Sequence, residues 1–100
     1  MAWTIVSVPT ARRAELDAAL KDDSVSRQSL TLRDASAMGG PADRTYVLVE
    51  GSAEGVRRAE ELLAPLGTRL TGADGEGIYR RFKKDEESAS AGMGLFFTEE

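Results

Sequence analysis

Two side chains are missing from this chain altogether, and each absence removes a class of chemistry. The 100 residues contain no cysteine and no histidine. Without cysteine there is no disulfide, no thiolate nucleophile and no zinc-thiolate site. Without histidine the chain lacks the side chain best suited to proton transfer near neutral pH and the commonest transition-metal ligand. The sequence therefore argues against the enzymes and metal sites that are built on these two residues.

Long apolar runs are missing as well. No segment approaches the roughly 18 apolar residues of a membrane span. Residues 1–8 have neither the basic start nor the small-residue cleavage site of a signal peptide. We therefore expect a cytoplasmic protein with no membrane partner. The apolar fraction of 41% and the charged fraction of 30% are those of an ordinary globular chain, and the length suits one domain.

Positive charge is missing from the end of the chain. Residues 1–84 hold all 13 lysines and arginines and 12 of the 17 acids, a net charge of +1, whereas the whole chain carries −4. The acidity thus belongs to residues 85–100. We predict a single domain over residues 1–84 and an acidic C-terminal extension over residues 85–100 that packs on the domain or on a neighbour. Overall charge neither suggests nor excludes a nucleic-acid partner.

What the chain does contain is a repeated strand-helix unit. Each copy has a short β-branched run, a turn, a Thr or Ser that caps a helix, and a helix with the letters Arg-Arg-Ala-Glu. These parts are residues 4–8, Thr10 and residues 12–15 in the first copy, and residues 45–49, Ser52 and residues 57–60 in the second. Two such units in tandem predict a two-layer α+β domain.

The pattern of apolar residues predicts the order strand, helix, strand, strand, helix, strand. The expected strands are residues 3–8, 25–34, 44–50 and 68–71, and the expected helices begin after Thr10 and Ser52. The first and third strands are apolar on both faces, which is typical of central strands. This order predicts a ferredoxin-like two-layer sandwich, with an antiparallel four-stranded sheet and two helices on one face.

Residues 1–71 resemble, at the level of the fold, the small ferredoxin-like modules that include the ACT and NIL regulatory domains. The stretch Tyr46-Val-Leu-Val-Glu-Gly-Ser52 followed by Arg58-Ala-Glu-Glu-Leu-Leu63 is similar to the second half of such domains. The resemblance implies a regulatory domain. Pro9-Thr10 stands where ACT domains have a glycine-containing ligand turn, so no ligand-binding residue is carried over.

The chain after residue 71 is predicted to extend the sheet. Residues 72–77 read as a flexible link, residues 78–84 as a fifth strand or an extension of the fourth, and residues 86–91 as a short helix. Two helices on one face leave the other face bare, and exposed apolar surface costs roughly 25 cal/mol per Å². We therefore expect that the C-terminal segment or a second copy covers this face, the latter in a homodimer.

The densest functional pattern is the run of residues 79–84, in which four cations interleave with two aromatic rings. The candidate contacts to a nucleic acid or another anion are Tyr79, Arg80, Arg81, Lys83 and Lys84. Aromatic stacking combined with guanidinium-phosphate contacts holds single-stranded nucleic acids. The other interpretation is an edge strand whose charges discourage aggregation and whose Phe82 belongs to the core.

Our first interpretation is a non-enzymatic interaction or regulatory domain that binds a protein partner or a small effector through its sheet. The alternatives are a single-stranded RNA-binding module that uses residues 79–84, and a small enzyme or enzyme subunit. We assign no catalytic, cofactor-binding or metal-binding residue and expect no cofactor. Neighbouring acids such as Asp22 and Asp23 point in different directions, and serine or threonine nucleophiles have only lysines or carboxylates as bases.

Overall fold

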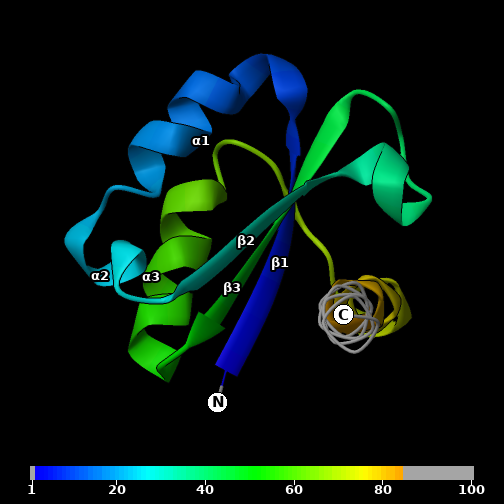
Figure 1. Cartoon of the computed structure of the whole chain (residues 1–100). Helices are drawn as coiled ribbons and strands as arrows, with labels where there is room; N and C mark the ends of the chain where they lie inside the picture. The colour runs from blue at the N-terminus through cyan, green and yellow to red at the C-terminus, as the bar shows by residue number, and fades with distance from the viewer. Residues whose placement is uncertain (1, 85–100) are drawn as a thin grey trace, which may run out of the picture.

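The computed structural model describes residues 2–84 and has a four-stranded antiparallel sheet at its centre (Figure 1). The strand order is β2-β3-β1-β4. The strands are β1 (Ala2–Pro9), β2 (Ser29–Asp34), β3 (Arg44–Gly51) and β4 (Thr68–Arg69). The predicted α+β class, with helices packed on an antiparallel four-stranded sheet, is confirmed.

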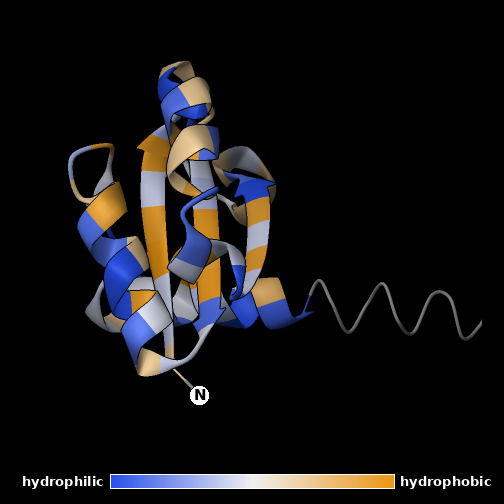
Figure 2. Cartoon of the chain, turned by 90° about the vertical axis from the view of Figure 1, so that its left-hand side faces the viewer, coloured by the Kyte–Doolittle hydropathy of each residue, from blue (hydrophilic) through white to orange (hydrophobic). Residues whose placement is uncertain are grey.

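The two central strands pair along their whole length. β1 and β3 run antiparallel from the pair Ala2 and Gly51 to the pair Pro9 and Arg44. Side chains alternate between the two faces of a strand, so runs such as residues 4–8 and 45–49 place buried side chains on both faces. Figure 2 shows apolar residues along these strands, whereas hydrophilic residues predominate on the helices. A sheet with such a centre needs cover on two sides.

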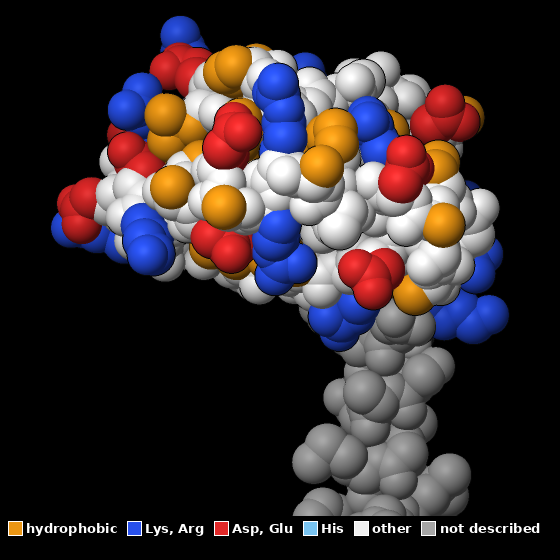
Figure 3. Space-filling view, turned by 90° about the horizontal axis from the view of Figure 1, so that it is seen from above, with side chains coloured by type: hydrophobic (Ala, Val, Ile, Leu, Met, Phe, Trp, Pro, Cys, Tyr) orange, Lys and Arg blue, Asp and Glu red, His pale blue; other side chains and the backbone are white. Residues whose placement is uncertain are grey.

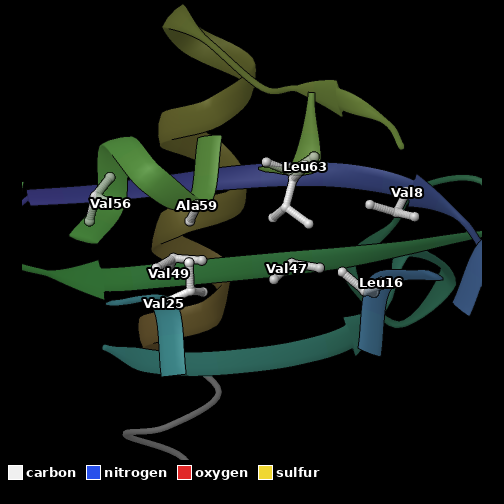
Figure 4. Packing of buried hydrophobic residues seen from close by; sticks show 9 residues of the cluster. Val8, Leu16, Val25, Val47, Val49, Val56, Ala59 and Leu63 are labelled. Carbon is white, nitrogen blue, oxygen red and sulfur yellow. The ribbon is translucent and has the colours of Figure 1, made fainter. Parts of the chain in front are cut away.

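The first face of the sheet is covered by α1 (Arg13–Ala19), α2 (Asp23–Ser26) and α3 (Ala53–Leu63). A 3-10 turn, η1 (Thr10–Arg12), leads into α1. In Figure 4 the side chains from these helices point at those of the central strands. The cluster consists of Val6, Val8, Leu16, Val25, Val47, Val49, Val56, Ala59 and Leu63.

The capping residues were predicted in part. Ser52 caps α3, since its Oγ accepts a hydrogen bond of 3.1 Å from the Gly55 amide. Thr10 makes no side-chain cap bond and lies within η1, so its predicted cap was wrong. Asp22, instead, caps α2, because its carboxylate accepts hydrogen bonds from the amides of Ser24 and Val25 at 3.1 and 3.3 Å. This cap winds Val25 into a helical turn, so the strand predicted over residues 25–34 begins only at Ser29.

The second face of the sheet is covered by a helix over residues 72–84, here called helix 72–84, and by η2 (Ala35–Met38). Figure 1 shows this helix on the side of the sheet opposite α1 and α3. The buried cluster here comprises Ile5, Ala35, Met38, Tyr46, Leu48 and Phe82, with Trp3, Leu70, Ile78 and Tyr79 packed against it. The expected C-terminal cover of this face is therefore present.

Helix 72–84 corrects two predictions. Residues 72–77 are not a flexible link, and residues 78–84 are not a fifth strand. The residues that face inward, Gly75, Ile78, Tyr79 and Phe82, recur at intervals of three and four, which is the spacing of a helix face. Four cations interleaved with two aromatic rings over residues 79–84 suggested an edge strand, but the two rings are three residues apart, which is a helical spacing. The short helix predicted at residues 86–91 and the rest of the predicted extension lie outside the described residues.

β4 is shorter than predicted because the chain turns away from the sheet. Its last bond to β1 runs from the Leu70 amide to the Ile5 carbonyl at 2.9 Å. Gly72 then has a φ of 61°, a left-handed conformation that glycine adopts without steric cost, and helix 72–84 begins there. Among the described residues, none of the helices is long and apolar enough to cross a membrane.

Two glycines of helix 72–84 allow a matched test of this arrangement. Gly77 lies within the helix and an added Cβ meets nothing within 4 Å, so Gly77→Ala should stabilise the domain by about 0.5–1 kcal/mol through helix propensity. Gly72 is equally open but has its positive φ, so Gly72→Ala should cost about 1–2 kcal/mol. Urea unfolding of both variants measures the two changes. A gain of stability in both would contradict the left-handed start of this helix.

Candidate functional site

A buried group of polar and aromatic side chains surrounds Glu50, near the end of β3. Glu50 is only 5% exposed. Its Oε1 accepts a hydrogen bond from Lys83 Nζ at 2.7 Å, and its Oε2 accepts one from the Tyr79 hydroxyl at 3.0 Å. Trp3 completes the group, because its ring stacks on that of Tyr79 with centroids 4.3 Å apart and planes at 15°. We call these four residues the Glu50 cluster.

Regular secondary structure places each member of the Glu50 cluster. Tyr79 and Lys83 are four residues apart in helix 72–84, so they lie one above the other on the same side. Trp3 and Glu50 are cross-strand partners in β1 and β3 and lie on the same face as Leu48. The ammonium of Lys83 also lies 5.5 Å from the centroid of the Tyr79 ring, within cation-π range. The cluster therefore fastens helix 72–84 to the sheet.

The structure divides the five residues predicted as nucleic-acid or anion contacts. Tyr79 and Lys83 point at Glu50 and are partly buried, while Arg80, Arg81 and Lys84 are exposed on the outer side of helix 72–84. Phe82 is buried in the core. The aromatic rings of this segment thus face the sheet and the exposed cations face away from it. A platform on which Tyr79 stacks with bases while its neighbours bind phosphate is not brought together by this helix.

The edge of β1 forms a second candidate site. In an antiparallel strand the N–H and C=O of one residue point to the same side, and alternate residues point to opposite sides. The Ile5 carbonyl accepts from Leu70 on the β4 side, so the N–H and C=O of Trp3, two residues earlier, point to that side as well. β4 pairs with Val6 and Ser7, and the chain has left the sheet where a partner for Trp3 would lie. Within residues 2–84, no strand continues β4 along Trp3.

A pocket of about 180 Å³ lies beside this edge. It is lined by Trp3, Thr4, Arg69, Leu70, Thr71, Gly72 and Glu76, and we call it the notch. Thr4 is 2% exposed, and its Oγ1 has no hydrogen-bond partner among the described residues. Its side chain lies on the first face with Val6, so this hydroxyl is enclosed in the core and is not open to the notch. Arg69 contributes a guanidinium that is paired with Glu60 at 2.9 Å.

The opposite edge of the sheet has a different character. By the same alternation, the carbonyl of Leu32 in β2 points away from β3, and Arg33 Nη1 donates a hydrogen bond of 2.9 Å to it. A charged side chain on an edge strand discourages pairing with another chain. A pocket of about 220 Å³ lies nearby, lined by Arg13, Leu32, Arg33, Asp34 and Thr45. Thr45 resembles Thr4 in that its buried Oγ1 has no partner among the described residues.

The charges on the described surface are mixed in sign. Figure 3 shows lysines and arginines interspersed with aspartates and glutamates on the face seen from above. Many are paired locally, as in the exposed helical pairs of Arg13 with Asp17 and of Arg57 with Glu61. No group of three His, Cys, Asp or Glu within the described residues is arranged to hold a metal ion. This surface presents no broad field of one sign to steer a charged partner.

Sequence reasoning did not find the Glu50 cluster or the notch. One signal was present in the sequence, because the helical spacing of Gly75, Ile78, Tyr79 and Phe82 indicates which face of helix 72–84 packs on the sheet. Glu50 carries a weaker signal, because an acid at the end of a buried strand requires a buried partner. No sequence signal predicts the notch, because its position depends on where β4 ends in the folded chain.

A double-mutant cycle tests whether Glu50 and Lys83 fasten the helix. Glu50→Gln should lower the free energy of unfolding by about 1–2 kcal/mol, because glutamine keeps one acceptor oxygen but removes the negative charge that pairs with Lys83, which is 37% exposed at its side chain and remains partly hydrated. The coupling with Lys83→Met should be about 0.5–2 kcal/mol. The exposed pair of Arg57 and Glu61 is the control, with an expected coupling of at most about 0.5 kcal/mol. Equal couplings for both pairs would refute the fastening role.

Comparison with known proteins adds no further guide to the site. No protein-family model, curated protein or solved structure matches the chain. The function must therefore be argued from the geometry of the two candidate sites. Of these, the Glu50 cluster pairs its carboxylate with Lys83 and Tyr79, whereas the backbone of Trp3 has no strand partner on the notch side among the described residues.

Proposed function

We propose that this chain is a non-enzymatic interaction or regulatory domain that binds a protein partner or a small effector at the edge of its sheet. The observation that carries the proposal is the notch, where the N–H and C=O of Trp3 face an open pocket beside the end of β4. Backbone groups and threonine hydroxyls bind a ligand without needing a reactive group. Because helices cover both faces of the sheet, its edge is the part through which the sheet contacts a partner.

We further propose that the domain is ferredoxin-like and regulatory. The strand order β2-β3-β1-β4, antiparallel throughout, supports this assignment, because a split βαβ arrangement places its first and third strands at the centre. Helix 72–84 is an addition on the second face. A homodimer remains part of the proposal, and the two copies would meet at an edge because both faces of the sheet are covered. The proposed location is the cytoplasm.

An amide-resolved NMR titration of the full labelled chain tests the binding proposal. One probe is a pool of random heptapeptides, and the other is a pool of amino acids, nucleotides and small carboxylates. We expect saturable shifts at Trp3, Thr4, Leu70, Thr71 and Glu76 with at least one pool. Line widths across a dilution series report a homodimer in the same samples. Saturable shifts confined to another surface, or none with either pool, would reject the notch as the site of function.

A second candidate function is binding of single-stranded RNA. It is favoured by the three exposed cations of helix 72–84, Arg80, Arg81 and Lys84, which lie close together on its outer side. Contacts from this cluster would be made to phosphates, because the rings of Tyr79 and Phe82 face the sheet. Such binding is independent of base sequence and strongly dependent on salt.

Charge removal distinguishes this candidate. If RNA binds here, Arg80→Ala combined with Arg81→Ala should weaken binding of a mixed-sequence single-stranded RNA and reduce the slope of log affinity against log salt by about 1–2. The control combines Arg27→Ala with Arg57→Ala, which removes two exposed cations of the first face, one just after α2 and one in α3. Equal effects of both pairs on fluorescence-anisotropy titrations would indicate nonspecific attraction only.

A further inference from the structure

We infer that the notch binds an extended segment of a partner polypeptide, which pairs with β1 at Trp3 and continues the sheet past the end of β4. This inference rests on the proposed function and specifies its ligand. The occupant is a peptide strand that is recognised through its backbone N–H and C=O groups. It lies beside β1 in the position that β4 would occupy if the chain did not turn away from the sheet at Gly72.

The backbone of β1 supplies both halves of a strand-strand contact. The N–H and C=O of Trp3 point together to the β4 side, as an exchange of two hydrogen bonds with one residue of an added strand requires. On its other side, Trp3 lies opposite Glu50 as a pair that exchanges no backbone bonds, since the register alternates along β1 and β3. Backbone pairing of this kind gives affinity with little dependence on side chains.

The surroundings of Trp3 favour a strand over other ligands. The side chain of Trp3 is held against Tyr79 on the second face, so it does not close the edge. Thr4 also lines the notch, but its side chain lies on the first face with Val6, so the polar groups at this edge are those of the β1 backbone. Arg69 and Glu76 line the notch with charges of opposite sign, so no net charge selects a small ion. A neutral, hydrogen-bonding occupant fits this lining best.

The two edges of the sheet are not equivalent for this purpose. At β2 the outward carbonyl of Leu32 already accepts a bond from Arg33. At β1 no side chain among the described residues performs that task for Trp3. The notch beside Trp3 and this difference at the Leu32 carbonyl together favour β1 as the edge at which a partner strand adds.

The probe is a peptide with the sequence acetyl-Lys-Thr-Val-Thr-Val-Thr-Glu-amide, which carries no net charge, and its control is the same peptide methylated at every backbone nitrogen. With the full labelled chain, we expect the unmethylated probe to shift the resonances of the notch and to slow hydrogen exchange of the Trp3 amide by about tenfold or more. The methylated peptide keeps the side chains but lacks the donors, and we expect it to leave that exchange unchanged.

A matched pair of variants tests the place of binding. Thr71 is exposed and lines the notch, so Thr71→Trp fills the space beside β1 without disturbing the core. Thr10 is exposed and does not line the notch, which makes Thr10→Trp the control. Thr71→Trp should weaken the peptide about tenfold or more and Thr10→Trp less than about twofold, with circular dichroism confirming that both variants fold.

The outcomes separate this inference from the proposed function. Shifts at the notch with the small-molecule pool but with neither the heptapeptides nor the probe would overturn strand addition and leave the edge site standing. Equal binding of the methylated probe would also overturn it, since side chains alone would then carry the contact. Probe shifts along β2 in place of β1 would overturn the choice of edge.

Discussion

The fold depends on one constraint, which is that β1 and β3 bury side chains on both of their faces. A single layer of helices satisfies half of this requirement, through the packing of Leu16, Val25 and Leu63 on the first face. Helix 72–84 satisfies the other half, with Phe82 inserted against Ile5 and Leu48. Glu50 then ties the helix to the sheet at its polar end. Helix 72–84 is therefore part of the core.

Covering the second face also decides where the molecule can meet a partner. A split βαβ sheet with helices on one side leaves its other side accessible. Here helix 72–84 and η2 cover that face, so only the edges of the sheet remain accessible. The two edges differ. At one edge the short strand β4 pairs with only part of the long strand β1, and at the other edge β2 pairs with β3 along its whole length. The proposed binding site results from this mismatch in strand length, which a change near Gly72 would alter.

The sequence predicted the central sheet well because its signals were local. Runs such as residues 44–50 carry strand propensity on both faces, and Ser52 marks the start of a helix by its own hydrogen-bonding geometry. The region after Leu70 was misread because its three glycines over residues 72–77 are typical of a link, and the cations and rings of residues 79–84 are also found in edge strands. Only packing against the sheet decides that Tyr79 and Phe82 share one side. The Glu50 cluster was unpredictable for a related reason, since it joins residues from β1, β3 and helix 72–84 that are distant in the chain.

The stacking of Trp3 on Tyr79 has a practical consequence. Trp3 is the single tryptophan of the chain, and its ring lies flat against a side chain of helix 72–84. The emission of an indole responds to what touches it, so undocking of the helix changes the optical signal of the whole protein. Tryptophan fluorescence therefore reports whether helix 72–84 is docked on the sheet, separately from whether the sheet is folded.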